Sequence, residues 1–199
     1  MERGAATDNV CMRVSGFTTV VICACSLLLA ACSPFMNWRT VQLENAPLQI
    51  ALPCKPQSQT RPVAMGAGSV QMSMVTCEAE GTTFAAMHFL LTDPTQAGEV
   101  LGYWQKAALK QLHGTGEQGA PEARRLKTDV LWIPKEALNL PQSQHIVFKG
   151  KNSQGRELVG EGLWFARMEG SSARLYHVVT YGNTDPKVTE MFFPSLKLQ

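Results

Sequence analysis

An uncharged run of fifteen residues, Phe17 to Ala31, constrains this 199-residue chain more than any other feature. A helix that crosses a membrane needs about 20 apolar residues, so this run is too short to span a bilayer comfortably. It has the length of the apolar core of a secretory signal peptide, and Arg13 supplies the positive charge that precedes such a core. Residues 1–11 are atypical for a signal peptide and Met12 begins a typical one, so Met12 is an alternative start to Met1.

The run ends in Leu29-Ala30-Ala31-Cys32, which resembles the lipobox of bacterial lipoproteins. The resemblance implies that the Cys32 thiol receives a diacylglycerol and that the chain is cut before Cys32. The new amino group would then be acylated, with palmitate as the typical acyl group. We therefore expect a signal peptide over 1–31, a lipidated tether over 32–40 and one globular domain over 41–199. An uncleaved anchor and plain secretion are the alternatives.

Ser33 rather than Asp follows the lipid cysteine. By analogy with lipoprotein sorting, this favours the periplasmic face of the outer membrane over retention at the inner membrane. Two or more acyl chains hold a protein stably on a bilayer. Cys32 would therefore connect the domain to the membrane without a transmembrane helix.

Apart from Cys32, the cysteines that remain after processing are Cys54 and Cys77. Two thiols in an oxidising compartment usually pair. Alternating patterns predict strands over 48–54 and 69–77, joined by a loop over 55–68, and strands adjacent in sequence often lie side by side. We expect a structural Cys54–Cys77 disulfide, because redox-active pairs typically have Cys-x-x-Cys spacing.

The remaining periodicities predict an α+β fold, with one antiparallel sheet and helices packed on it. One helix is expected over 95–113 with Thr95 as its cap, and a short one over 186–192 capped by Asp185 or Thr184. Further strands are expected over 82–92, 127–133, 144–149, 156–167 and 173–180.

Several landmarks resemble small bacterial envelope lipoproteins of the Mog1/PsbP-like class. They are Leu52-Pro-Cys-Lys-Pro56, Cys77-Glu-Ala-Glu-Gly81, Lys149-Gly-Lys-Asn-Ser-Gln-Gly155, Leu163-Trp-Phe-Ala-Arg167, Arg174-Leu-Tyr176 and Phe192-Phe-Pro-Ser-Leu196. The resemblance implies a three-layer α/β/α sandwich and an accessory role, with no catalytic centre common to the class.

The sequence offers little for catalysis, metal binding or nucleic-acid binding. A formal net charge of +2 with scattered basic residues lacks the basic surface of a nucleic-acid-binding protein. His88, His113, His145 and His177 have no metal-ligand spacing, although His88 and His177 could face one sheet surface. The run Gly114–Gly119 matches G-x-G-x-x-G but follows a predicted helix, where a dinucleotide site needs a preceding strand. We expect no catalytic residue, metal or cofactor.

The leading hypothesis is therefore a non-enzymatic, lipid-anchored protein that binds an envelope protein through an exposed apolar groove or patch. Trp164 or Tyr103 could line such a groove. A small-ligand carrier is the alternative and would need a deep pocket of roughly several hundred cubic ångströms. An envelope hydrolase is less favoured, since it would need a pocket that joins a histidine to a serine, cysteine or carboxylate.

Overall fold

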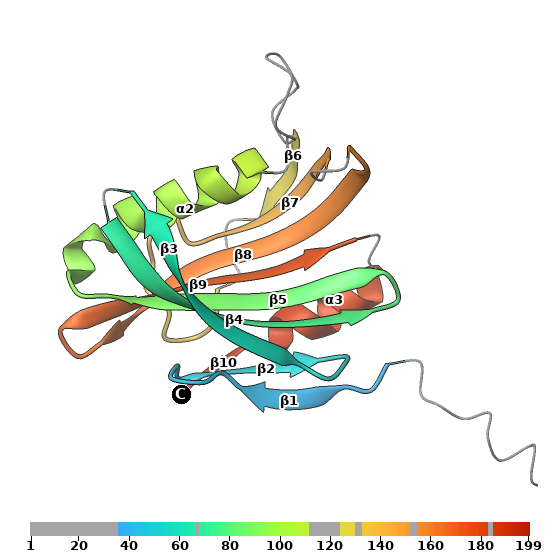
Figure 1. Cartoon of the computed structure of the whole chain (residues 1–199), viewed down its shortest axis with the longest axis horizontal. Coiled ribbons are helices and arrows are strands. Elements are labelled where there is room, and N and C mark those ends of the chain that lie inside the picture. Colours follow the sequence, from blue (N-terminus) through green and yellow to red (C-terminus); the bar gives the residue numbers. More distant parts are fainter. Residues whose placement is uncertain (1–35, 67, 112–123, 130–132, 152–154, 183–184) are drawn as a thin grey trace, which may run out of the picture. The chain divides into compact units, whose positions relative to one another are not determined.

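The computed structural model describes residues 36–199, except residues 67, 112–123, 130–132, 152–154 and 183–184. The expected signal peptide, Cys32 and the run Gly114–Gly119 lie outside the described residues. Residues 36–199 form one compact unit. Its described part contains a seven-stranded sheet, a three-stranded sheet and two α-helices, which is an α+β architecture dominated by antiparallel sheet (Figure 1).

The seven-stranded sheet is antiparallel throughout, with the strand order β3-β4-β5-β9-β8-β7-β6. Its central strands are buried on both faces, as the continuously buried runs 162–166 of β8 and 175–180 of β9 show. The strands are β3 (Gln57–Met65), β4 (Gly68–Ala79), β5 (Thr82–Leu91), β6 (Arg124–Asp129), β7 (Gln144–Lys151), β8 (Glu157–Glu169) and β9 (Ser172–Tyr181).

The small sheet joins the two ends of the described chain. Strand β2 (Leu48–Leu52) lies between β1 (Arg39–Gln42) and the last strand, β10 (Lys197–Leu198). Leu48, Ile50 and Leu52 alternate toward the core and are fully buried. The small sheet therefore covers part of one face of the large sheet.

Two helices occupy opposite faces of the large sheet (Figure 1). Helix α2 (Ala97–Gln111) follows the 3₁₀ turn η1 (Pro94–Gln96), and its Leu101 and Trp104 pack into the core on one face. Helix α3 (Pro186–Phe192) precedes the 3₁₀ turn η2 (Phe193–Ser195) and packs with the small sheet on the other face.

Side chains alternate between the two faces of the central strands, so each strand contributes residues to the hydrophobic core on both faces of the large sheet. On β9, Leu175 and Val179 belong to the core beneath α2, whereas Tyr176 and Val178 belong to the core beneath the small sheet and α3. Phe192 of α3 meets Phe84 of β5 edge to face, with ring centroids 5.1 Å apart. The large sheet is thus the middle layer of the domain.

Strand β3 corrects one expectation. Residues 55–68 were predicted to be a loop because they are rich in Pro, Gln, Ser and Gly, but Gln57–Met65 pairs along its whole length with β4. It is an edge strand, and most of its residues are exposed on both faces, so it needs no apolar alternation. Edge position also accommodates Pro62, which lacks a backbone N–H.

The folded unit begins before the predicted tether ends. Asn37 N–H donates to the Pro53 carbonyl at 3.0 Å, and β1 begins at Arg39, inside the 32–40 segment. Trp38 is half-buried and packs on the core beneath the small sheet. Residues 37–40 are therefore part of the domain.

The Cys54–Cys77 disulfide is present, with an S–S distance of 2.04 Å. The expected route to it was wrong, because the two cysteine-bearing segments are not paired strands. Cys54 follows β2 of the small sheet, whereas Cys77 lies in β4, whose neighbours are β3 and β5. The bridge therefore joins the two sheets covalently.

Candidate functional site

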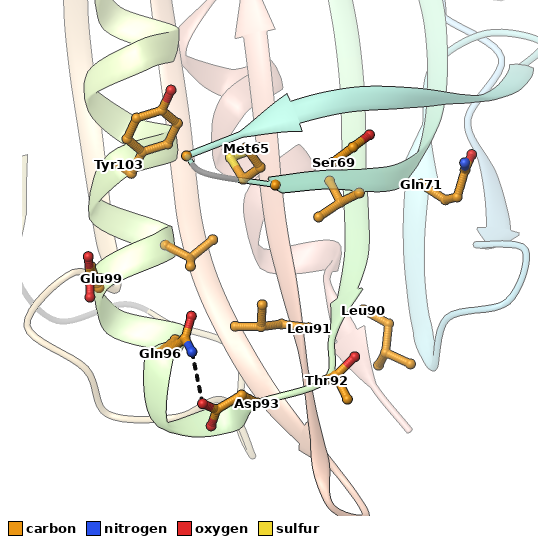
Figure 2. A pocket seen from close by; sticks show the side chains of 14 residues that line it. Met65, Ser69, Gln71, Leu90, Leu91, Thr92, Asp93, Gln96, Glu99 and Tyr103 are labelled. Carbon is orange, nitrogen blue, oxygen red and sulfur yellow. Dashed lines mark hydrogen bonds between the residues drawn. The ribbon is translucent and has the colours of Figure 1, made fainter.

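A groove of about 660 Å³ lies where strands β4 and β5 separate (Figure 2). Their pairing ends at Ser73 and His88, although β4 runs on to Gly68 with β3, and β5 runs on to Leu91 with β9. The β3–β4 hairpin turns away from β5 at this point and reaches toward α2. The groove is the wedge that this divergence leaves between the hairpin, the end of β5 and the first turns of α2.

Apolar side chains gather on one part of the groove lining, beside an equal number of polar ones. Met65, Val70, Leu91 and Val100 continue the core beneath α2 outward to the surface. Leu90 and Tyr103, which also line the groove, are each 47% exposed. A volume near 660 Å³ is within the range of about 300–1,000 Å³ that is usual for ligand sites.

One end of the groove is acidic. The Asp93 carboxylate accepts hydrogen bonds from the Thr95 backbone N–H at 3.0 Å, the Thr95 hydroxyl at 2.6 Å and the Gln96 side-chain Nε2 at 2.9 Å. The hydrogen bonds from Thr95, followed by that from Gln96, lower the pKa of the Asp93 carboxyl, so it stays ionised. Thr95 was expected to cap the helix, but it lies within the 3₁₀ turn η1, whose N-cap is Asp93, and α2 begins two residues after Thr95.

Glu99 is the second carboxylate of the lining and lies in the first turn of α2. It is exposed and has no ion-pair partner among the described residues. A negative charge is favourable there, because the helix dipole places partial positive charge at this end. The described residues that line the groove include no histidine, cysteine, lysine or arginine.

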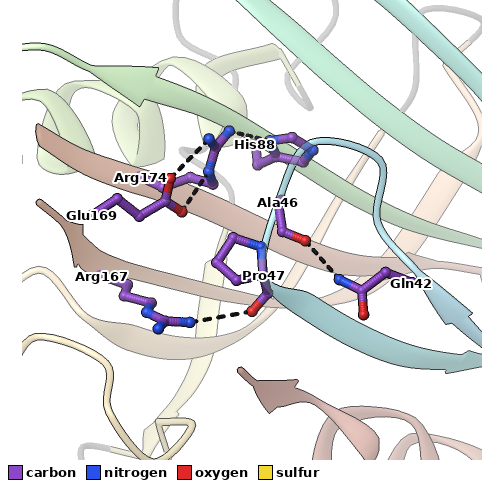
Figure 3. Close-up of polar contacts among 7 residues, drawn as sticks. All are labelled: Gln42, Ala46, Pro47, His88, Arg167, Glu169 and Arg174. Carbon is purple, nitrogen blue, oxygen red and sulfur yellow. Dashed lines mark hydrogen bonds and ion pairs between the residues drawn. The ribbon is translucent and has the colours of Figure 1, made fainter.

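A second polar cluster lies on the opposite face of the large sheet (Figure 3). Arg174 donates to Glu169 through two parallel bonds, Nε to Oε1 at 2.7 Å and Nη2 to Oε2 at 2.9 Å. Its Nη1 lies 3.1 Å from Nδ1 of His88. Burial, reinforced by the Arg174 charge, lowers the pKa of His88 to about 4 and keeps this imidazole neutral.

This cluster fastens the turn between β1 and β2 to the large sheet. His88 also hydrogen-bonds the backbone of Glu44, and Gln42 holds the turn by donating to the Ala46 carbonyl at 2.7 Å. Arg167 reaches the Pro47 carbonyl at 3.4 Å. The charged groups of Arg167, Glu169 and Arg174 therefore have partners that hold the fold together.

A cavity of about 180 Å³ adjoins His88 and is lined by Ser73 of the neighbouring strand. Ser73 and His88 are direct cross-strand partners and so form a candidate serine–histidine pair. The Ser73 hydroxyl, however, shares a hydrogen bond of 2.9 Å with the Thr60 hydroxyl, and Nδ1 of His88 lies 3.1 Å from Arg174. Both side chains are therefore held by other partners of the fold.

His177 lies on the other face from His88, so the possibility that both face one surface is not realised. His177 is opposite Met87 in the pairing with β5, one position from His88. It is buried between Trp104 and Trp164, and neither ring nitrogen has a hydrogen-bond partner among the described residues. Burial lowers its pKa to about 3.

Other sequence-based interpretations are resolved residue by residue. Tyr103 lines the groove, whereas Trp164 is fully buried. Glu161 lies 2.8 Å from the His145 ring, and Glu169 binds Arg174. Glu157 is exposed beside Lys149. His113 lies outside the described residues.

In the described ranges, no group of three or more His, Cys, Asp or Glu side chains could hold a metal ion. No helix there is both long enough and apolar enough to cross a membrane. The chain matches no protein-family model and no curated protein sequence.

Sequence reasoning missed most of the groove. Tyr103 was one of the two aromatic residues, with Trp164, that were predicted as candidates to line a surface groove. Leu90 and Val70 were assigned to strands, and nothing in their alternation shows that β4 and β5 part there. Gly66 and Gly68 were the sequence signal for the hairpin that forms one wall of the groove. Gly66 adopts φ of +63° at the hairpin tip, a conformation that favours glycine.

Proposed function

We propose that the protein is a lipid-anchored component of the bacterial cell envelope with a non-catalytic binding role, and that the groove is its binding site. The observation that carries the proposal is a groove whose lining includes a group of apolar side chains, two of which, Leu90 and Tyr103, are half exposed. Large apolar side chains that remain exposed around a concave surface are typical of interaction sites.

The anchor rests on the sequence. The lipobox-like ending at Cys32 supplies the lipidated residue, and Ser33 supports the periplasmic face of the outer membrane. The folded unit begins only a few residues later, with Asn37 already hydrogen-bonded to Pro53. The domain would therefore be held close to the bilayer surface.

The arrangement of polar groups supports a non-catalytic role over an envelope hydrolase. The histidines with strongly lowered pKa values, His88 and His177, are buried away from the groove lining. Ser73 and His88 are neighbours, but their hydrogen-bonding groups are already used in holding the fold.

A small-ligand carrier is the second candidate, because the groove volume is that of a ligand site. Carrier pockets usually enclose about 70–90% of the ligand surface. The half-exposed Leu90 and Tyr103 favour a macromolecular partner, which can cover these rim residues as well as fill the groove.

We also propose that the fold is of the Mog1/PsbP-like α/β/α type. The supporting features are the large antiparallel sheet as a middle layer, α2 on one face and α3 with the small sheet on the other. The short closing helix followed by Phe193-Pro-Ser-Leu196 is the part of the resemblance that carries over most directly.

Anchoring is tested by producing the full chain in a bacterium with radiolabelled palmitate. The wild-type chain should be labelled and shortened, and Cys32→Ser should be neither. Processing and labelling that are unchanged in Cys32→Ser would contradict the anchor.

Binding is tested by placing a photo-crosslinking amino acid at Tyr103 in the full chain, in intact cells. A discrete adduct is expected from position 103, and it should disappear when Leu90→Asp is added. The control places the same crosslinker at Met191, which is 51% exposed on α3 and not part of the groove lining. Equal adducts from both positions would count against the groove, and an organic extract rich in one small molecule would favour the carrier.

A further inference from the structure

The groove exposes the edge of a central strand. Beyond His88, β5 is paired with β9 only, and among the described strands none pairs with its other edge at Phe89–Leu91. In an antiparallel sheet, alternate residues direct their backbone N–H and C=O groups toward one neighbour and then the other. Part of this short stretch therefore presents hydrogen-bonding groups into the groove.

The outer edge of the same sheet is unsuited to strand pairing. It is formed by β3, which carries Pro62 in its interior and the exposed Arg61 beside it. Proline and charged residues are the usual means by which edge strands avoid pairing with other chains. The edge inside the groove, at Leu90 and Leu91, carries neither.

The side chains along the edge suit an added strand with alternating residues. Leu91 lies opposite Ala173 and belongs to the α2 side, whereas Leu90 lies opposite Arg174 on the other side. Successive residues of a strand placed beside them would point to these two sides in turn. Those on the α2 side would meet Met65, Val70 and Val100, so they should be apolar.

The negative charge at the end of the groove favours a bound strand with a basic residue next to its apolar positions. Asp93 is held ionised, and Glu99 has no basic partner among the described residues. A lysine or arginine next to the apolar positions would lie close to both carboxylates. An acidic flank would be repelled.

The groove lies far from the point where the chain joins the domain. Asn37 bonds to Pro53, next to the Cys54–Cys77 bridge, and Cys77 is eight residues along β4 from Ser69 of the groove. At about 3.3 Å per residue, the stretch of β4 from Cys77 to Ser69 is roughly 26 Å long. Figure 1 shows β1 beginning at one side of the large sheet and the β3–β4 hairpin ending at the other. A partner bound in the groove would therefore lie away from Asn37 and β1.

We propose that the groove binds an extended segment of a partner polypeptide, which adds as a short strand to the β5 edge at Phe89–Leu91. The segment has apolar residues at alternate positions and a basic residue beside Asp93 and Glu99. This inference rests on the proposed binding role and specifies the partner of that same groove. At about 3.3 Å per residue, four residues of such a segment span about 13 Å.

The probe is a phage-displayed library of short linear peptides, selected on the full-chain lipoprotein in neutral detergent after depletion on its Tyr103→Ala variant. Enriched peptides should share alternating apolar positions and a Lys or Arg flank. Synthetic versions with single N-methyl groups test the backbone, because each removes one N–H donor. Binding should fall at least about tenfold when alternate amides are methylated and change little at the amides between them.

Charge is tested with Glu99→Lys and with Glu190→Gln as the control, since Glu190 is exposed on α3. Glu99→Lys should weaken Lys-flanked peptides about fivefold or more, and Glu190→Gln should leave them unchanged. Enriched peptides that tolerate methylation at every amide would overturn strand addition, and equal binding of Lys- and Glu-flanked peptides would overturn the charge rule. Either result can coexist with the adduct at position 103, whereas loss of that adduct as well would remove the binding role itself.

Discussion

The imidazole of His177 lies flat on the indole of Trp164, with ring centroids 4.0 Å apart and an interplanar angle of 13°. Trp104 of α2 meets the same imidazole edge-on at 5.6 Å. A histidine thus fills an aromatic position in the core beneath α2. Its ring must stay uncharged there, because burial disfavours the imidazolium form.

This burial predicts that the domain loses stability in mild acid. The pKa of His177 falls from 6.5 to about 3, and that of His88 from 6.5 to about 4. Between these values and 6.5 the unfolded chain binds more protons than the folded one, so the free energy of unfolding falls as the pH falls. His177 alone should contribute a slope of up to about 1.4 kcal/mol per pH unit.

Urea denaturation at several pH values between about 4 and 7 measures this slope. His177→Leu should flatten the profile of the wild-type protein, whatever its effect on the absolute stability. A slope that is the same with and without His177 would show that this residue does not titrate as its burial requires.

Gly160→Ala should destabilise the domain by about 1–3 kcal/mol, as overpacking of a core does. Gly160 lies opposite Phe148 across the β7–β8 pair, and a Cβ atom there would run into the Phe148 ring and lie 2.9 Å from the Thr180 carbonyl. Gly68→Ala is the matched control, because a Cβ atom at Gly68 meets nothing within 4 Å. Chemical denaturation compares the two, and equal losses would argue against the close approach at Gly160.

Reduction of the Cys54–Cys77 bridge should lower the free energy of unfolding by roughly 3 kcal/mol, the chain-entropy value for a loop of this length. Thermal unfolding with and without reductant measures the loss. The double variant Cys54→Ala, Cys77→Ala should have the lower stability already and should not respond to reductant. A response in that variant would mean that reductant acts elsewhere.

Glu169→Gln should cost about 2 kcal/mol, between the values of exposed and fully buried ion pairs. Glu169 pairs with Arg174, and the side chains of Arg174 and Glu169 are only 12% and 22% exposed. Loss of the carboxylate leaves the Arg174 charge without its partner. Glu157→Gln removes a carboxylate from the more exposed pair with Lys149 and should change stability by less than about 0.5 kcal/mol. Denaturation curves that rank the two variants in the opposite order would contradict this assignment.

The fold was predictable where burial imposes a pattern. Strand β2, strand β5 and helix α3 follow from alternation, apolar runs and the Asp185 cap, because each buries a defined face. Strand β3 has no such signal, since its residues lie at the sheet edge and are mostly exposed. A polar edge strand and a polar loop have the same composition, and only pairing with β4 distinguishes them.

The candidate site was less predictable than the fold for a related reason. The groove is the place where a regular pairing stops, at Ser73 and His88, and the residues beyond that point keep the alternation of an ordinary strand. Tyr103 and Leu90 come together only because the hairpin bends toward α2. Register and divergence of this kind depend on tertiary packing that local patterns do not encode.

The inter-sheet bridge also determines how the domain responds to mechanical load. A pull on the proposed anchor at Cys32 would act first on Asn37 and would peel β1 from β2, beginning at the Arg39–Leu52 pair. Unravelling would then halt at Cys54, which is bonded to β4 of the large sheet. Under load the segment from Asn37 to Cys54 would unfold and lengthen, and the groove at the far end of β4 would keep its shape.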